Sequence, residues 1–173
     1  HQSQQYRLED NLLRYFPELI EQNKKFIEGF NADIKTLSEH PHPIDGFAGM
    51  TVRGDVLTDK ENAGAALVDA FKEVKGLDPV PVGSYRGFAM SMTLEDFGRD
   101  YVLTLKGKMT HRVTLGKDPR GNLTRIDNAL NGMTDRLTAV QGKLDSLYSQ
   151  METAKAELGK SFPQEDELKQ KSA

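Results

Sequence analysis

The sequence predicts an α+β protein in which a long antiparallel helical hairpin, packed as a coiled coil, carries an inserted small antiparallel sheet plus one helix. Three observations predict this class: a 3-4 spacing of apolar residues near both ends, an alternating apolar pattern between them, and turn signatures that separate the segments. The expected segments are a first coiled-coil helix at 4–39, an α+β head at 46–118, a second coiled-coil helix at 122–158 and a tail at 159–173 that leads to the next segment.

The clearest helical pattern lies near the C-terminus. Apolar residues recur there at alternating spacings of three and four: Leu123, Ile126, Leu130, Met133, Leu137, Val140, Leu144, Leu147, Met151, Ala154 and Leu158. This narrow seam is typical of a coiled coil, with Asn122 expected as the N-cap and Gly159 as the C-terminal stop. Because such a helix has only one apolar stripe, it requires a partner.

A matching pattern near the N-terminus supplies that partner. The same rhythm is carried by Leu13, Phe16, Ile20, Asn23, Ile27, Phe30, Ile34 and Leu37. Pro17 predicts a kink or break, and Asn23 is either a tolerated polar layer or a residue that fixes the register of the pair. An intramolecular hairpin is favoured, and a dimeric coiled coil is the alternative.

The segment between the helices has the signals of a small α+β head. A strand is expected at 49–57, followed by a helix that Thr58 and Glu61 begin as a capping box and that Gly76 ends. Apolar residues at every second position then predict a long strand from Val80 to Leu94. A hairpin that turns at Lys106-Gly107 follows, and the turn signature "DPRG" leads into the last helix.

The charge of the chain is unevenly distributed. Its formal net charge is −3, yet residues 99–125 hold seven lysines and arginines against two aspartates, which gives +5 for this stretch. Lys106, Lys108 and Arg112 share one parity, so regular strands would present them on one face. We expect backbone contacts to nucleic acid from Lys106, Lys108, Arg112, Lys117, Arg120 and Arg125. The alternative is a solvated sheet edge that lysines protect against pairing.

Other candidate sites have simpler explanations. Gly116-Lys117 lacks the spacing of a phosphate-binding loop. The run His40-Pro41-His42-Pro43 with Asp45 is interpreted as a linker, and Arg53-Gly54-Asp55 as a chance match to an adhesion tripeptide. His111 has no serine or carboxylate arrangement around it in the sequence. We therefore expect no catalytic residue, no metal site and no cofactor.

Two compositional features bear on the setting of the chain. It contains no cysteine, which favours a reducing cytoplasm, and it has no apolar run of the ~20 residues that span a bilayer, so no membrane partner is expected. The first residues do not resemble a signal peptide, and both ends suggest a piece of a larger protein.

Several stretches resemble a segment of very large proteins from bacterial conjugative elements. They are "YRLEDNLLRYFPELIEQNKKFIEGFNADI", "GMTVRGDVLTDKENAGAAL", "GSYRGFAMSM" and "AELGKSFPQEDELKQKSA". Those proteins combine an adenine DNA methyltransferase region with a Swi/Snf-type superfamily 2 helicase region, and the likeness lies downstream of the motor motifs. The resemblance implies a parent that is an ATP-dependent DNA helicase on a mobile genetic element, and it transfers no catalytic residue to this chain.

The sequence therefore predicts a non-catalytic, helicase-associated and methyltransferase-associated module. It would contact the DNA backbone through a basic β-hairpin, act as a spacer arm and touch other segments of the parent protein. The alternative is a protein-interaction or dimerisation module that forms a homodimer. A third interpretation, target recognition for the methyltransferase, rests on analogy alone.

Overall fold

A computed structural model describes residues 2–161 of the chain, so most of the predicted tail at 159–173 lies outside the described residues. The chain divides into two compact units, one formed by residues 1–27 and 137–173 and the other by residues 28–136. The segment boundaries expected from the sequence stay predictions. No helix among the described residues is long and apolar enough to cross a membrane.

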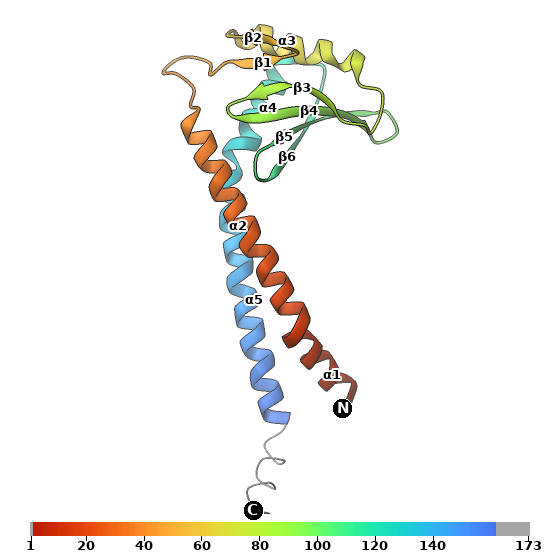
Figure 1. Ribbon diagram of the computed structural model, residues 1–173, viewed down its shortest axis with the longest axis vertical. Coiled ribbons are helices and arrows are strands. Elements are labelled where there is room, and N and C mark those ends of the chain that lie inside the picture. The colour runs from red at the N-terminus through yellow and green to blue at the C-terminus, as the bar shows by residue number, and fades with distance from the viewer. Residues whose placement is uncertain (1, 162–173) are drawn as a thin grey trace, which may run out of the picture. The chain divides into compact units, whose positions relative to one another are not determined.

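The first unit is built from helical segments at both ends of the chain. They are α1 (Gln2–Asp10), the π-helical turn η1 (Asn11–Tyr15), the beginning of α2 (Phe16–Glu39) and most of α5 (Met133–Ser161) (Figure 1). Phe16 and Ile20 are buried in a small cluster with Leu147 and Ala154. Partly buried leucines and Met151 surround this cluster.

The π-helical turn explains how Pro17 is accommodated. The backbone N–H of Phe16 donates to the carbonyl oxygen of Asn11, five residues earlier. Proline has no N–H and its ring crowds the preceding turn, so a helix commonly widens or kinks there. The irregularity predicted from Pro17 is therefore present, and it lies in the turn before the proline.

The second unit is a six-stranded antiparallel sheet with helices (Figure 1). The strand order is β2-β1-β3-β4-β5-β6. The strands are β1 (Met50–Val52), β2 (Asp55–Leu57), β3 (Val80–Tyr85), β4 (Phe88–Glu95), β5 (Asp100–Lys106) and β6 (Thr110–Leu115). The helices are the end of α2, α3 (Lys60–Asp69) with the 3-10 turn η2 (Ala70–Glu73), and α4 (Pro119–Asn131).

The α+β class and the antiparallel sheet agree with the sequence, but the long helical hairpin coiled coil is wrong. The predicted second helix is divided at Gly132 into α4 and α5. The apolar residues of α4 and Met133 at the start of α5 belong to the core of the sheet-containing unit, where Leu123, Ile126, Leu130 and Met133 are fully buried. A 3-4 spacing is shared by coiled-coil seams and by helices that cover a sheet, so the spacing alone could not separate the two.

Several local expectations also differ from the structure. Residues 49–57 form a tight β1–β2 hairpin that turns at Arg53-Gly54, where one strand was expected. Asp118, with Pro119 at the first helical position, caps α4 and accepts from the backbone N–H of Gly121. The residue expected in that role, Asn122, is buried and bonds both backbone groups of Gly116.

Helices α3 and α4 pack closely in the second unit. Gly64 of α3 is fully enclosed, and a Cβ added there would lie 2.7 Å from the carbonyl oxygen of Pro119. This close approach sets the two helix beginnings side by side, so that Glu61 and Arg120 form an ion pair at 2.8 Å.

Candidate nucleic-acid interface

The register of the sheet separates its two faces. One face contributes Met90, Leu105 and His111 as one row across β4, β5 and β6, with the row of Met92, Leu103 and Val113 beside it. These side chains are buried. The core of the unit therefore lies on this face.

The opposite face of the sheet is polar, and we call it the polar face. Its row beside the β5–β6 turn runs through Thr51, Ser84, Ala89, Lys106 and Thr110, which are successive partners across β1, β3, β4, β5 and β6. A second row contains Ser91, Thr104 and Arg112. All of these side chains are exposed or half-buried.

The exposed part of the polar face ends towards the β4–β5 turn. Thr93 and Val102 are opposed on this face, and both are buried. The Thr93 hydroxyl donates to Glu95 at 2.6 Å, and Arg112 also donates to the Glu95 carboxylate. The hydrogen bond from Thr93 and the Arg112 guanidinium lower the pKa of Glu95.

The six basic residues expected to contact nucleic acid fall into two groups. Arg112 is paired with Glu95, Arg120 is paired with Glu61, and Arg125 donates to the carbonyl oxygen of Thr114 at 3.2 Å. Within residues 2–161 no carboxylate pairs with Lys106, Lys108 or Lys117, and all three are exposed. The three lysines are thus the cations most available to a ligand.

The turn that carries Lys106 and Lys108 is held by a buried carboxylate. Asp33 of α2 is 1% exposed, and its oxygens accept from the backbone N–H groups of Lys108 at 2.7 Å and Met109 at 2.9 Å. Its Oδ2 also lies 2.7 Å from Nε2 of His111. This arrangement gives the hairpin tip a fixed attachment to the end of α2.

The environment of His111 fits a structural role. Its Nδ1 lies 3.4 Å from a guanidinium nitrogen of Arg136, which can only donate, so the network favours the tautomer with the proton on Nε2. Both ring nitrogens are therefore occupied. The expectation that His111 is not a catalytic base stays a prediction, and the contacts leave no nitrogen open to a substrate.

A second polar cluster joins the 40–49 segment to the sheet and α4. Asp127 accepts from the Tyr85 hydroxyl at 2.6 Å and lies 3.1 Å from Nε2 of His42, while Nδ1 of His42 accepts from the backbone N–H of Ala48. Burial and the bond to Asp127 raise the pKa of Tyr85. The Tyr85 hydroxyl therefore stays protonated and serves as a donor.

Sequence reasoning missed this second cluster. His42 lies in a segment that was interpreted as a linker, and its partners are far away in the chain. Phe47 stacks on both His42 and Tyr85 at centroid distances of 5.9 Å, and the His42 and Tyr85 rings lie 6.3 Å apart. The one available signal was the density of aromatic and histidine residues in this short segment, which is high for a solvated linker.

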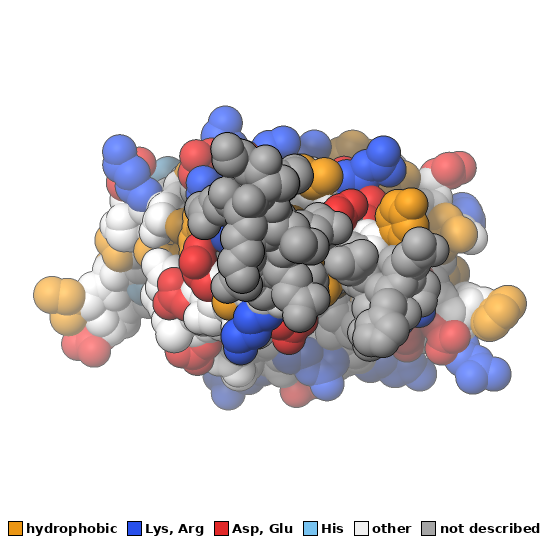
Figure 2. Space-filling model, turned by 90° about the horizontal axis from the view of Figure 1, so that it is seen from below, with side chains coloured by type: hydrophobic (Ala, Val, Ile, Leu, Met, Phe, Trp, Pro, Cys, Tyr) orange, Lys and Arg blue, Asp and Glu red, His pale blue; other side chains and the backbone are white. Residues whose placement is uncertain are grey.

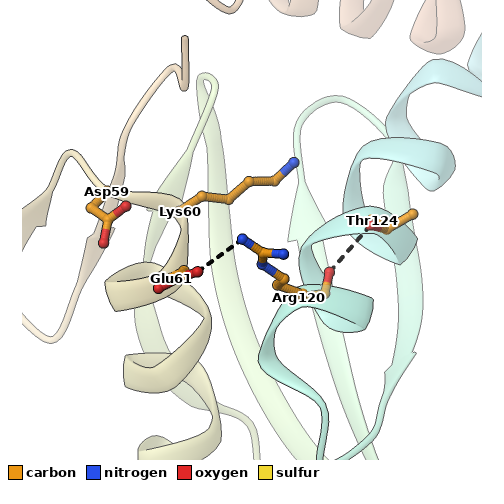
Figure 3. Close-up of a pocket in the computed structure, with 5 residues that line it drawn as sticks. All are labelled: Asp59, Lys60, Glu61, Arg120 and Thr124. Atoms are coloured by element: carbon orange, nitrogen blue, oxygen red, sulfur yellow. Dashed lines mark hydrogen bonds and ion pairs between the residues drawn. The ribbon is translucent and has the colours of Figure 1, made fainter.

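The pocket between the beginnings of α3 and α4 offers little for catalysis. It measures about 340 Å³ and is lined by Asp59, Lys60, Glu61, Arg120 and Thr124. Figure 3 shows Arg120 reaching across it to Glu61. Because the guanidinium is already neutralised, this part of the predicted basic surface is balanced by acid.

Surface charge elsewhere is mixed. In the view of Figure 2, lysine and arginine side chains alternate with aspartate and glutamate, and exposed apolar side chains lie among them. No protein-family model, curated protein or solved structure matches this chain in the comparisons.

Proposed function

We propose that this chain is a non-catalytic module that binds the sugar-phosphate backbone of nucleic acid on the polar face of its sheet, beside Lys106. One observation carries the proposal. The register places Lys106 in a row with Thr51, Ser84 and Thr110, next to the small side chain of Ala89. Lysine and hydroxyl side chains are common donors to phosphate oxygens, and a methyl group lets a backbone approach closely.

The shape of the polar face favours contacts to the backbone over reading of base edges. A helix or a two-stranded ribbon enters the major groove, whereas a sheet with neighbours on both sides of its strands does not. β5 lies between β4 and β6, so Lys106 projects from within the sheet. Binding of this kind gives affinity with little sequence choice and depends strongly on salt.

The setting of this activity follows from the resemblance and stays part of the proposal. The module would act within a cytoplasmic DNA-processing protein that carries helicase and methyltransferase regions. Its role there would be to hold the DNA backbone while another region performs the chemistry. DNA and neighbouring segments of the same parent protein are the partners proposed.

Salt-dependent binding tests the proposal. Fluorescence anisotropy with a labelled 15-nucleotide oligothymidylate and a duplex of equal length should give an affinity that falls as salt rises. Replacing Lys106, Lys108 and Lys117 together by glutamine should weaken binding and reduce the logarithmic salt slope by about 2, because each lost phosphate contact removes about 0.7 to 0.9. A matched variant with Lys25, Lys35 and Lys143 changed to glutamine has the same net charge and should keep the wild-type slope. Equal slopes for the two variants would contradict the proposed surface.

A protein-interaction module is the second candidate, and one observation favours it. Tyr6 and Leu13 of the first unit are 71% and 78% exposed, and large apolar side chains mark a protein-interaction site where they form a common patch. Molar mass measured by light scattering across a wide concentration range separates the candidates. If the molar mass of the wild-type chain rises with concentration while that of Leu13→Asp stays at the monomer value, self-association is favoured over nucleic-acid binding as the main role.

A further inference from the structure

Phe97 is the most exposed large apolar side chain of the described residues. Its side chain is 101% exposed, and it lies in the turn that joins β4 to β5. Single exposed apolar residues are common on protein surfaces and need no explanation by themselves. The backbone of this residue supplies the second observation.

The backbone at Phe97 adopts a conformation that a bulky residue rarely takes. Asp96, Phe97 and Gly98 have consecutive positive φ values of 53°, 55° and 82°. Glycine is suited to this region, whereas a phenylalanine there costs conformational energy. The turn is nevertheless well anchored, because the N–H of Arg99 donates to the carbonyl oxygens of Glu95 and Asp96 at 3.1 Å each. Strained residues in an ordered turn are often found at functional sites.

The charges around Phe97 suit an uncharged ring better than a phosphate. Glu95 is neutralised by Arg112, and Arg99 stands between Asp96 and Asp100 in the sequence. Lys106 and Lys108 lie at the other end of β5, about 20 Å away at ~3.4 Å per residue, whereas Lys117 follows β6 at the end nearer the β4–β5 turn. A phosphate backbone held at Lys106 therefore has to pass the Arg112–Glu95 pair and the buried Thr93 and Val102 to bring a base to Phe97.

We propose that Phe97 stacks on an unpaired base of single-stranded nucleic acid whose backbone lies on the polar face. This inference rests on the proposed function and adds a substrate class to it. Proteins that bind single strands combine cations along the backbone with aromatic side chains against which bases stack. The register puts hydroxyl groups, Ala89, cations and the carboxylates of Glu95 and Asp100 on the polar face, and Phe97, in the turn beyond Glu95, is the exposed aromatic side chain of the second unit.

Two oligonucleotides separate base stacking from backbone binding. The first is the labelled 15-nucleotide oligothymidylate, and the second is an abasic deoxyribose-phosphate oligomer with the same number of phosphates. The wild-type chain should bind the first more tightly. Phe97→Ala should weaken binding of oligothymidylate by about fivefold or more, in line with the loss of one stacked base, and should leave binding of the abasic oligomer unchanged.

The absence of tryptophan from the chain permits a direct optical readout. Phe97→Trp introduces a single indole at the proposed contact, and its fluorescence should be quenched by oligothymidylate and not by the abasic oligomer. Ile44→Trp is the control, because Ile44 is 97% exposed in the segment between α2 and β1, outside the sheet. Its fluorescence should respond to neither oligomer. Both positions are exposed, so neither change disturbs the core.

The binding measurements test base stacking and backbone binding separately. A preference for oligothymidylate that disappears in Phe97→Ala supports base stacking. Equal binding of both oligomers by wild type and Phe97→Ala overturns base stacking and leaves backbone binding intact, with Phe97 then available to a protein partner. Failure of the wild-type chain to bind either oligomer at low salt overturns the proposed function and base stacking together.

Discussion

Oδ2 of Asp33 and Nε2 of His111 lie 2.7 Å apart, and both side chains are buried. The same carboxylate accepts from two consecutive backbone N–H groups of the β5–β6 turn. Asp33 thus links α2, the hairpin tip and the core face of β6 through one residue. Lys106 and Lys108, to which we assign nucleic-acid binding, lie at the turn that this link holds.

Removing the Asp33 carboxylate should destabilise the second unit strongly. Asp33→Ala leaves two backbone donors and His111 without a partner in a buried site, which we expect to cost about 3 kcal/mol or more of unfolding free energy. Urea unfolding followed by circular dichroism measures this loss. Asp145→Ala removes an exposed carboxylate from α5 and should change stability by less than about 0.5 kcal/mol. Equal losses in the two variants would show that the buried network contributes little.

The Tyr85 hydroxyl should make stability depend on alkaline pH. Its pKa is raised above the ordinary value of 10.0, so the protonated form is favoured in the folded state. The resulting stabilisation is fully present below pH 10 and is lost as the pH rises towards the folded-state pKa. Tyr85→Phe should cost about 1–2 kcal/mol at neutral pH and should show a smaller loss of stability between pH 9 and 11 than wild type. Denaturation curves at a series of pH values measure this. If the hydroxyl is not involved, the unfolding free energies of wild type and Tyr85→Phe will fall with the same slope above pH 9.

Releasing Arg112 should strengthen nucleic-acid binding. Glu95→Gln removes a negative charge and leaves the Arg112 guanidinium available, so affinity for the oligothymidylate should rise by a few-fold and the salt slope should steepen by about 0.7. Because the pKa of Glu95 is lowered, mild acid does not protonate it, and the ion pair survives until the pH falls below the ordinary range of glutamate. Glu28→Gln, on the exposed surface of α2, is the control for the change in net charge. A gain of equal size in the control would assign the effect to long-range charge.

Two glycine-to-alanine changes should act in opposite directions. A Cβ at Gly83 would overlap the carbonyl oxygen of Thr51 on β1, and Gly83 has a φ of 144°. Gly83→Ala should therefore disrupt the pairing of β1 with β3 and lower the free energy of unfolding by at least about 2 kcal/mol. Gly142 lies within α5 with nothing near its missing side chain, so Gly142→Ala should add about 0.5–1 kcal/mol. Thermal unfolding of both variants measures the difference. Stabilisation by Gly83→Ala would contradict the described approach of β1 to β3.

The local patterns of the sequence predicted much of the head. Alternation predicted strands over residues 80–94 and 101–105, and Lys106-Gly107 lies at the observed hairpin turn, but the single strand expected from Val80 to Leu94 is wrong because it is divided into β3 and β4 by a turn at Arg86-Gly87. These signals are local, because strand alternation and turn preference depend on neighbouring residues. The parity that placed Lys106 and Arg112 on one face also follows from strand geometry alone, and the register agrees with it.

The long-range partners could not be predicted. The apolar spacing of 123–133 looks the same whether a helix packs on another helix or on a sheet, and the second arrangement is the one observed. The pairing of Arg112 with Glu95 and of Arg120 with Glu61 required knowledge of which turns meet. The network of His42, Tyr85 and Asp127 joins residues more than forty positions apart, and the aromatic and histidine residues near position 42 do not identify these partners in a single sequence.

The contact of Gly64 with Pro119 restricts how this protein can change over generations. At that position any side chain would separate α3 from α4 and break the ion pair that spans their first turns. In a library that samples every substitution, position 64 should therefore be nearly invariant among folded survivors, while the neighbouring exposed positions 62 and 65 should vary freely.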